Sequence, residues 1–297
     1  MLSKILVYEA IYWWSYALVF LTLCRLFRLL KRGRVLPFLL VAGFLVLFVW
    51  MRFREPAQIE VEEKMIDIWV HKKVVLISDL HLWVYKDWVY LQKVVNKINS
   101  LWGIDYVFIA GDFTYNPTKH QNLDELFQPL ADLKVPVYAV LGNHDEQKPW
   151  PDLKYDLVRA LEKNGVQYLQ NDVVKLDGFF LVGLGPHLAG EDDVFLLKNF
   201  HVLNKVVVLT HNPDTVLNYN NSNADLTLVG HTHCGQIRLP LIHDRLRPYY
   251  YPVEGDFDCG YMKTKYTKLY ITPWLGEVII PMRRRNPPKI SVIDLGK

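Results

Sequence analysis

Five short apolar runs in this chain are each followed, within three residues, by a cluster of polar side chains. The runs are rich in valine, isoleucine and leucine and are typical of buried strands. They span residues 74–77, 106–109, 135–140, 206–209 and 226–229. Because the carboxyl ends of neighbouring parallel strands meet at one edge of a sheet, the five polar clusters are expected to converge there.

Amphipathic patterns between these runs predict helices and further strands. Apolar residues from Trp88 to Ile98 recur at helical spacing, which predicts a helix over 88–101. The dipeptide Asp177-Gly178 between two apolar runs predicts a β-hairpin. The other expected elements are helices over 122–133, 153–163 and 192–200 and late strands over 268–272 and 290–293. Strands that alternate with helices, with a hairpin inserted, predict a layered α/β sandwich.

The first 52 residues have a different character. Two apolar runs, 5–23 and 36–51, flank a basic connector that contains Arg25, Arg28 and Lys31. Each run approaches the roughly 20 residues that span hydrocarbon, and the aromatic stretch 12–16 resembles an interfacial belt. The alternative is a pair of buried helices in a soluble fold. We therefore predict a hydrophobic membrane anchor over 1–52, a polar linker over 53–65 and a catalytic domain over 66–297.

The pattern leaves two membrane topologies open. If both runs span, the basic connector lies in the cytoplasm and the catalytic domain lies outside. If the runs form a shallow hairpin, the domain stays on the cytoplasmic face. The short second run and Glu9 in the first run leave room for this arrangement.

Charge and cysteine content restrict the class of partner. The net charge of +3 is too balanced to support nucleic acid as a partner. The chain has 3 cysteines, and an odd number argues against a disulfide framework. Cys24 lies in an apolar stretch, where it is expected to behave as a small hydrophobic residue.

The polar clusters carry a donor set that suits metal ions. Aspartate, histidine and asparagine together favour manganese, iron or zinc and disfavour a thiolate zinc site. A bridging carboxylate could hold two ions roughly 3.5–4 Å apart, which could clamp a phosphate and ionise water. Each cluster alone has an ordinary reading; Asp79-Leu80-His81, for example, could cap a helix. The joint pattern is more specific. The candidate metal ligands are Asp79, His81, Asp112, Asn143, His211, His231 and His233.

This series of motifs resembles the calcineurin-like metallophosphoesterases over about residues 73–295. The motifs are Asp-x-His at 79–81, Gly-Asp at 111–112, Gly-Asn-His-Asp at 142–145, a lone His211 and Gly-His-x-His at 230–233. The segments 211–214 and 230–236 look most like the membrane-associated bacterial branch. The resemblance implies an αββα sandwich and a hydrolase with two divalent metal ions, manganese being preferred over iron or zinc.

The resemblance also implies individual roles. Asp79, His81, Asp112 and His233 would hold one ion, and Asp112, Asn143, His211 and His231 would hold the other. His144 would face the substrate phosphate, and Asp145 would hydrogen-bond to His144 and set its tautomer. The chain departs from the branch at Cys234, where glycine is common and a free thiol is expected here. A second departure is the turn 272–276, which replaces a glycine-rich turn.

Membrane-bound members of the family include the UDP-2,3-diacylglucosamine pyrophosphatases of lipid A biosynthesis, and this is our preferred reading. It requires the catalytic domain on the cytoplasmic face of the cell (inner) membrane. The alternatives are a cell-envelope phosphodiesterase or phosphatase with another substrate, and a non-catalytic protein-binding scaffold. The expected partners are the bilayer and a lipid-linked or nucleotide-linked phosphate.

Two further groups could meet such a substrate, although each also has a structural reading. The aromatic residues Trp83, Tyr85, Trp88 and Tyr90 could form an apolar lip or be ordinary helix packing. The arginines 245, 247 and 283–285 could meet phosphates or form a solvated basic face.

Overall fold

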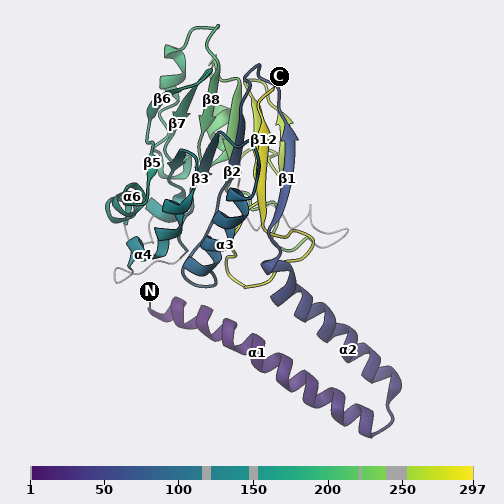
Figure 1. The fold of residues 1–297 in the computed structure, drawn as a ribbon. Helices are drawn as coiled ribbons and strands as arrows, with labels where there is room; N and C mark the ends of the chain where they lie inside the picture. Colours follow the sequence, from purple (N-terminus) through teal and green to yellow (C-terminus); the bar gives the residue numbers. More distant parts are fainter. Residues whose placement is uncertain (1, 116–121, 147–152, 221–222, 239–252, 297) are drawn as a thin grey trace.

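The computed structural model describes residues 2–115, 122–146, 153–220, 223–238 and 253–296, and it contains two sheets packed face to face, with a helical hairpin that projects from one end of them (Figure 1). The first sheet has the strand order β1-β12-β2-β3-β4-β5. Its strands are β1 (Glu60–Met65), β2 (Lys73–Ile77), β3 (Tyr106–Ala110), β4 (Val137–Val140), β5 (Val166–Tyr168) and β12 (Lys289–Asp294).

The second sheet has the order β10-β11-β9-β8-β7-β6. Its strands are β6 (Asp172–Leu176), β7 (Phe179–Gly183), β8 (Val206–Leu209), β9 (Leu226–Val229), β10 (Gly260–Lys263) and β11 (Lys268–Ile271). The central strands of both sheets run parallel, and β6 and β10 are antiparallel edges. In the first sheet the register pairs Ile77 with Ile109, so β2 and β3 end at the same level.

Helices cover the outer face of the first sheet. They are α3 (Trp88–Asn99), α4 (Leu123–Phe127) and α6 (Lys154–Lys163), while the short α5 (Asn143–Glu146) follows β4. The apolar side chains fall into three layers: one beneath these helices, one between the two sheets, and one on the outer face of the second sheet. The strands β2, β3, β8 and β9 are buried on both faces, which explains their continuous apolar sequences. The predicted α/β sandwich is confirmed.

Three local predictions require correction. The helix expected over 122–133 breaks after Phe127 into a 3-10 segment, Gln128–Asp132, because Pro129 cannot donate a helical hydrogen bond. The helix expected over 192–200 is likewise a 3-10 turn, Val194–Asn199. The polar stretch 53–65, expected as a linker, contains β1, which pairs in parallel with β12. Its charged side chains suit an exposed edge strand.

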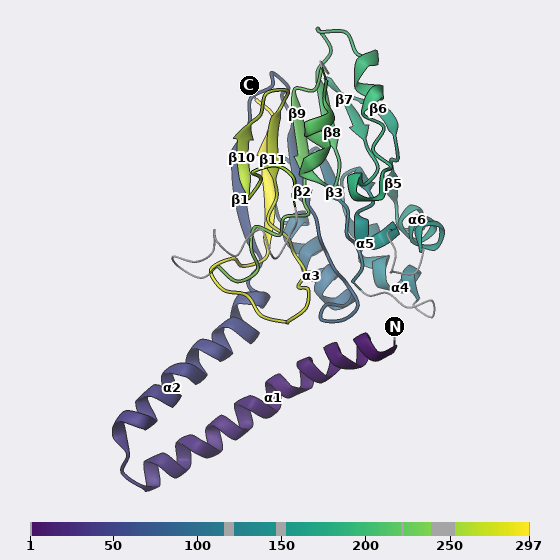
Figure 2. The same cartoon turned by 180° about the vertical axis from the view of Figure 1, so that it is seen from behind.

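The helical hairpin consists of α1 (Leu2–Lys31) and α2 (Val35–Val49), continued by a π-helical turn, Trp50–Arg54, and a 3-10 turn, Glu55–Ala57. The hairpin projects away from the sheets, and the N-terminal end of α1 lies near them (Figures 1 and 2). Two segments, Leu6–Lys31 and Val35–Ala57, are long and apolar enough to cross a membrane. No residue of α2 is buried. These helices indicate that the chain associates with a membrane.

Candidate metal centre

The seven predicted metal ligands lie on the segments that follow β2, β3, β4, β8 and β9, and Asn143 is the first residue of α5. Asp79 and His81 follow β2, Asp112 follows β3, and His211 follows β8. Because these strands end at a common edge of the sandwich, the loops meet there. The backbone joins them directly: the amide of Asp79 donates to the carbonyl of Gly111 at 2.9 Å. The amide of His81 donates to the carbonyl of Asp112 at 3.1 Å.

Five of the predicted ligands have a left-handed backbone. Positive φ angles occur at Asp79 (52°), His81 (43°), Asp112 (55°), His231 (68°) and His233 (57°). Such conformations cost non-glycine residues about 1–3 kcal/mol each and persist only where the surroundings impose them. Their concentration in these loops indicates that backbone strain is used to turn the side chains towards one point.

Two glycines allow the loops to approach closely. A Cβ atom at Gly142 would lie 2.1 Å from Oδ1 of Asp112, and one at Gly230 would lie 2.5 Å from Oδ2 of Asp79. Real Cβ atoms do not come this close to other heavy atoms. The glycines in the Gly-Asn-His-Asp and Gly-His-x-His motifs therefore make room for carboxylates of neighbouring loops.

The first group of ligands is compact. One ligand atom each from Asp79, His81, Asp112 and His233 lies within 4.8 Å of all the others. Nε2 of His233 is 3.1 Å from Oδ1 of Asp79 and 3.3 Å from Nε2 of His81. The structure thus brings together the four residues predicted to hold the first ion.

The second group adjoins it through Asp112. Nε2 of His211 lies 3.3 Å from Oδ2 of Asp112 and 3.3 Å from Nδ1 of His231. The other nitrogen of His211, Nδ1, lies 2.7 Å from the carbonyl of Ala110, which leaves Nε2 facing the carboxylate. Oδ1 of Asn143 accepts a hydrogen bond from Asn212 at 3.4 Å. Asp112 therefore has neighbours from both predicted ligand sets.

The buried polar atoms of this centre fit metal ions. Asp79 and Asp112 are fully buried, yet Oδ1 of Asp79 and Oδ2 of Asp112 accept no hydrogen bond from the described residues. Nε2 of His231 likewise has no hydrogen-bond partner among them. Buried polar atoms normally have partners, so three converging exceptions fit a site that holds metal ions.

Electrostatics gives most of these ligands the protonation state that metal binding needs. Burial raises the pKa of Asp112. The facing His211 and His144 lower this pKa by more than burial raises it, so the carboxyl is ionised. Burial lowers the pKa of His231 to about 3 and also lowers that of His233, so both rings are neutral at pH 7. His211 differs: burial lowers its pKa, but Asp112 outweighs this and raises it to about 9. Metal binding at His211 has to displace that proton.

His144 and Asp145 lie beside the ligands. The amide of His144 donates to Oδ1 of Asp112 at 2.9 Å, and its ring stands edge-on to that of His81, with centroids 5.1 Å apart. Burial lowers the pKa of the His144 ring to about 4. Asp145 accepts hydrogen bonds from the amides of Phe113, Thr114 and Gly142, and so fastens two loops together. Its predicted hydrogen bond to His144 stays a prediction.

Sequence reasoning missed the support beneath His233. The ring of Trp274 is fully buried and stacks on His233 with centroids 3.7 Å apart. Arg283 lies over the other side of Trp274 at 4.9 Å, and its Nε donates to Glu277 at 2.8 Å. The only sequence signal was the departure from a glycine-rich turn at 272–276. That turn supports a ligand from below.

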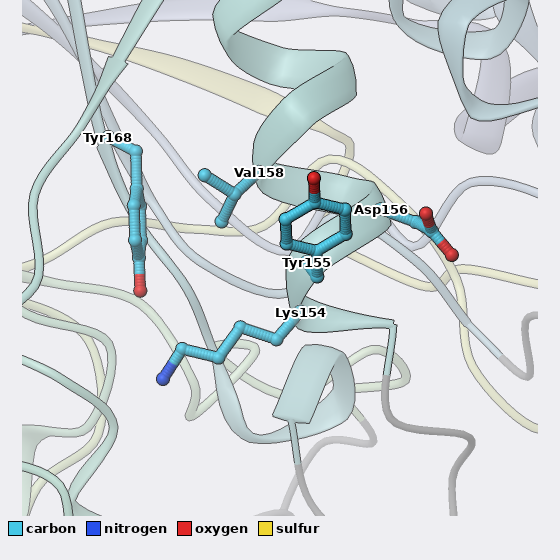
Figure 3. A pocket seen from close by; sticks show the side chains of 5 residues that line it. All are labelled: Lys154, Tyr155, Asp156, Val158 and Tyr168. Carbon is cyan, nitrogen blue, oxygen red and sulfur yellow. The ribbon is translucent and has the colours of Figure 1, made fainter.

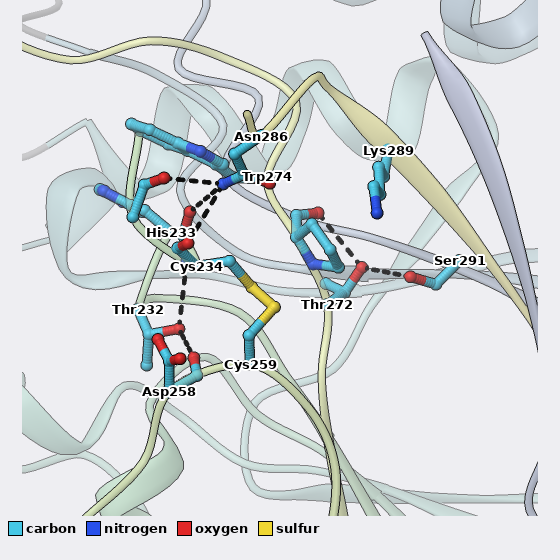
Figure 4. Close-up of a disulfide and its surroundings, with 12 residues drawn as sticks. Thr232, His233, Cys234, Asp258, Cys259, Thr272, Trp274, Asn286, Lys289 and Ser291 are labelled. Carbon is cyan, nitrogen blue, oxygen red and sulfur yellow. Dashed lines mark hydrogen bonds between the residues drawn. A yellow bond between two sulfur atoms is a disulfide. The ribbon is translucent and has the colours of Figure 1, made fainter. Parts of the chain in front are cut away.

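The prediction of a free thiol at Cys234 is wrong. Cys234 forms a disulfide with Cys259, and the odd cysteine is Cys24 (Figure 4). The carbonyls of His233, Cys234 and Gly235 all accept hydrogen bonds from the Asn286 side chain. The prediction from the cysteine count was wrong because three cysteines can still form one disulfide and leave one cysteine free. The loop that carries His233 is therefore tied down on both sides.

The predicted aromatic lip divides into two parts. Trp83 and Trp88 are 41% and 48% exposed and remain available at the surface. Tyr90 is buried and donates its hydroxyl to the carbonyl of Leu275 at 2.7 Å, which is a structural role. Tyr85 contacts α1: its ring stacks on that of Tyr12 at 6.4 Å.

The predicted basic group divides similarly. Arg283 is completely buried and bound by Glu277, so it cannot meet a substrate phosphate. Arg284 is half-buried and Arg285 is exposed, while residues 245 and 247 lie outside the described part of the chain.

A separate pocket beside α6 has a volume of about 420 Å³. It is lined by Lys154, Tyr155, Asp156, Val158 and Tyr168 (Figure 3). None of these residues is a predicted ligand. The ammonium of Lys154 lies 2.7 Å from Glu191 and 3.2 Å from Glu146. We assign this pocket no function.

Comparison with known proteins agrees with this geometry. The model of the calcineurin-like phosphoesterase family matches residues 72–235, more than half of the chain. The Danio rerio protein called "Transmembrane protein with metallophosphoesterase domain" is 27% identical over 288 residues, which cover 89% of this chain and 63% of that protein.

Two bacterial relatives have names that state a reaction. The phosphodiesterase YaeI of Escherichia coli is 28% identical over 235 residues, covering 75% of this chain and 82% of that protein. The UDP-2,3-diacylglucosamine pyrophosphatase LpxG of Chlamydia muridarum is 26% identical over 257 residues, covering 68% of this chain and 77% of that protein. With the family match and the Asp-His cluster together, the chain belongs to the calcineurin-like phosphoesterase family and is a hydrolase with a site for divalent metal ions.

Proposed function

We propose that this protein hydrolyses a phosphoester or pyrophosphate bond of an amphiphilic substrate presented at a membrane surface. The observation that carries the proposal is the contact between the anchor and the wall of the metal centre. The hydroxyl of Tyr8, in α1, lies 3.1 Å from that of Tyr115, and the ring of Tyr115 lies 5.6 Å from that of His144. An active site in contact with a membrane helix is placed to receive a substrate that is itself held in the bilayer.

The chain's own residues divide the work. Asp79, His81, Asp112 and His233 would hold one ion, and Asp112, Asn143, His211 and His231 the other; manganese is our preferred metal. When bound, the ions would supply charge for the phosphate and activation of water. The half-buried ring of His144, neutral at pH 7 and beside Asp112, would donate a ring N–H to the phosphate and stabilise its developing charge. Asp145 would hold the His144 loop in place through its amide hydrogen bonds.

One candidate substrate is UDP-2,3-diacylglucosamine, a reaction of lipid A biosynthesis that would release UMP. The similarity to LpxG and the apolar anchor support this candidate. It requires the catalytic domain on the cytoplasmic face.

A second candidate is a phosphodiester on the outer side of the membrane, and three observations favour it. The disulfide between Cys234 and Cys259 suits an oxidising compartment. The basic residues near Lys31 lie at the tip of the hairpin, far from the sandwich, and the positive-inside rule favours a cytoplasmic side for such a tip. The similarity to the phosphodiesterase YaeI supports a phosphodiester as the substrate. We favour this topology over the cytoplasmic one expected from the sequence.

Product analysis separates the candidates. The detergent-purified chain is loaded with manganese and assayed on UDP-2,3-diacylglucosamine, a glycerophosphodiester and a generic phosphate ester, with Asp112→Ala as the blank. Release of UMP supports the first candidate, and cleavage of the glycerophosphodiester alone supports the second. If the protein cleaves the generic ester but neither of the other two substrates, the proposed substrate class is wrong.

A protease test fixes the side of the membrane. Protease added to spheroplasts should digest the catalytic domain if it lies outside. If the domain is digested only after the membrane is permeabilised, the outer location is wrong and the cytoplasmic one stands.

A further inference from the structure

An apolar groove runs along the junction between the anchor and the sandwich. It has a volume of about 420 Å³ and lies between α1, the end of α2 and residues 280–282. Its apolar walls include Ile11, Trp14 and Leu18 of α1 and Phe48 of α2. Three sides of the groove are therefore built from segments far apart in the sequence, two of which belong to the candidate membrane spans.

A buried cation lines this groove. Arg52 is only 7% exposed, and its Nε donates to the hydroxyl of Ser15 at 2.9 Å. Its guanidinium lies over the rings of Tyr12, Tyr16 and Phe53 at 4.7–5.6 Å. In the described part of the chain its Nη2 has no hydrogen-bond partner, and no carboxylate forms an ion pair with it.

Such an arginine lacks a counter-ion. A buried charge without a partner is costly, and aromatic faces offset only part of that cost. The planar guanidinium prefers an anion that accepts two hydrogen bonds, such as a phosphate. The groove thus combines one anion-binding group with walls that suit a hydrocarbon chain.

We propose that this groove binds one anionic phospholipid of the surrounding leaflet, with its phosphate beside the guanidinium of Arg52 and one acyl chain along Ile11, Trp14 and Leu18. The charge of Arg52 distinguishes this occupant from a neutral lipid. The position at the end of two membrane spans distinguishes it from a soluble anion. The proposal concerns lipid binding and does not depend on which substrate is hydrolysed.

A lipid bound in the groove would contact a segment that lies next to the metal centre. The carbonyls of Ile280 and Met282, which lie in the groove wall, accept hydrogen bonds from Gln236 at 2.6 and 2.8 Å. Gln236 follows closely after the ligand His233. The amide of Arg283 also donates to the carbonyl of Met51 at 2.8 Å. The occupant would therefore hold the anchor against the segment that borders the ligand loop.

The test is native mass spectrometry of the full chain in mild detergent, titrated with phosphatidylglycerol or with phosphatidylcholine. We expect one phosphatidylglycerol per chain at concentrations where phosphatidylcholine is not retained. Arg52→Gln should weaken phosphatidylglycerol binding about tenfold or more, the usual effect of losing a charge-assisted hydrogen bond. Arg54→Gln removes the same charge from a neighbouring exposed side chain and should bind as the unmodified chain does.

A second variant guards against misfolding at Arg52. Ala10 lines the groove and is exposed, so Ala10→Phe fills the space without removing a contact of Arg52. It should reduce lipid retention with an unchanged melting temperature. Equal retention of phosphatidylglycerol by Arg52→Gln and the unmodified chain would overturn the proposal. Equal retention of both lipids, undiminished binding by Ala10→Phe, or a lipid-free dimer that covers the groove would overturn it as well.

Discussion

The strands that end at the metal centre and the helices of the N-terminal hairpin contain the same apolar residue types, but these residues are buried in the strands and exposed in the hairpin. Val74, Val75, Leu76 and Ile77 of β2 are completely buried, whereas Leu36 and Val46 of α2 are 69% and 70% exposed. The β2 run is short and is followed by polar ligands, and helices cover one of its faces while the second sheet covers the other. The α2 run continues for 15 residues without a charge. The length of an apolar run, more than its composition, decides whether protein or bilayer covers it.

The two regions meet through polar and aromatic groups. Tyr8 and Tyr12 of α1 contact Tyr115 and Tyr85 of the sandwich. Glu55, just after the hairpin, accepts a hydrogen bond from the amide of Asn286 at 2.8 Å. Since directional contacts hold this junction, substitutions can test each region and the junction separately.

The largest effect is expected inside the metal edge. Asp112→Ala removes the carboxylate between the two ligand groups and should lower turnover about a thousandfold or more. Bound metal, counted by elemental analysis, should fall below two ions per chain. Asp156→Ala, on the exposed face of α6, is the matched control and should leave both values unchanged. Full activity of Asp112→Ala would refute the assigned role of this carboxylate.

A smaller effect is expected from the support beneath His233. Trp274→Ala empties a fully buried site, and we expect a loss of about 3–5 kcal/mol in the free energy of unfolding. Metal affinity should fall with it, because His233 loses the ring on which it stacks. Trp102→Ala, at a residue that is 91% exposed, should change stability by less than about 0.5 kcal/mol. Unfolding in denaturant and metal titration measure the two quantities; unchanged metal affinity in Trp274→Ala would exclude a positioning role.

The disulfide should make a moderate contribution to the stability of the fold. Its cysteines are 25 residues apart, and loops of this size lose about 2–4 kcal/mol of stability when the bond is removed. We expect this loss in Cys259→Ser, measured by thermal unfolding without reductant. Cys24→Ser, which removes the free thiol, should leave the melting temperature nearly unchanged. If both variants melt alike, the bond does not stabilise the ligand loop.

The smallest effect is expected at the junction. Tyr8→Phe removes the hydroxyl contact with Tyr115, which is worth about 0.5–1.5 kcal/mol. A double-mutant cycle with Tyr115→Phe, read from unfolding in detergent, should show coupling of that size. Tyr155→Phe, at an exposed tyrosine, should show no coupling with Tyr115→Phe. Zero coupling between Tyr8 and Tyr115 would mean that the two regions are stabilised independently.

The ligand edge could be read from the sequence because each element is local. A short β-branched run predicts a strand, and the polar residues that follow it must lie at its carboxyl end. The strand β1 could not be read this way, since the charges of Glu60 and Glu62 suit a linker and an edge strand equally well.

By itself, the sequence determined the strands that precede the ligands, the ligand types and the apolar anchor, because these follow from residue chemistry and local periodicity. Only the tertiary structure decided that Cys234 meets Cys259, that Trp274 supports His233, and that Arg52 lies buried beside a groove. Each of these contacts joins segments between 25 and 41 residues apart, or brings a helix against a distant loop. The chain's local pattern does not encode such pairings; they arise when the two sheets close on a common core and the hairpin returns against it.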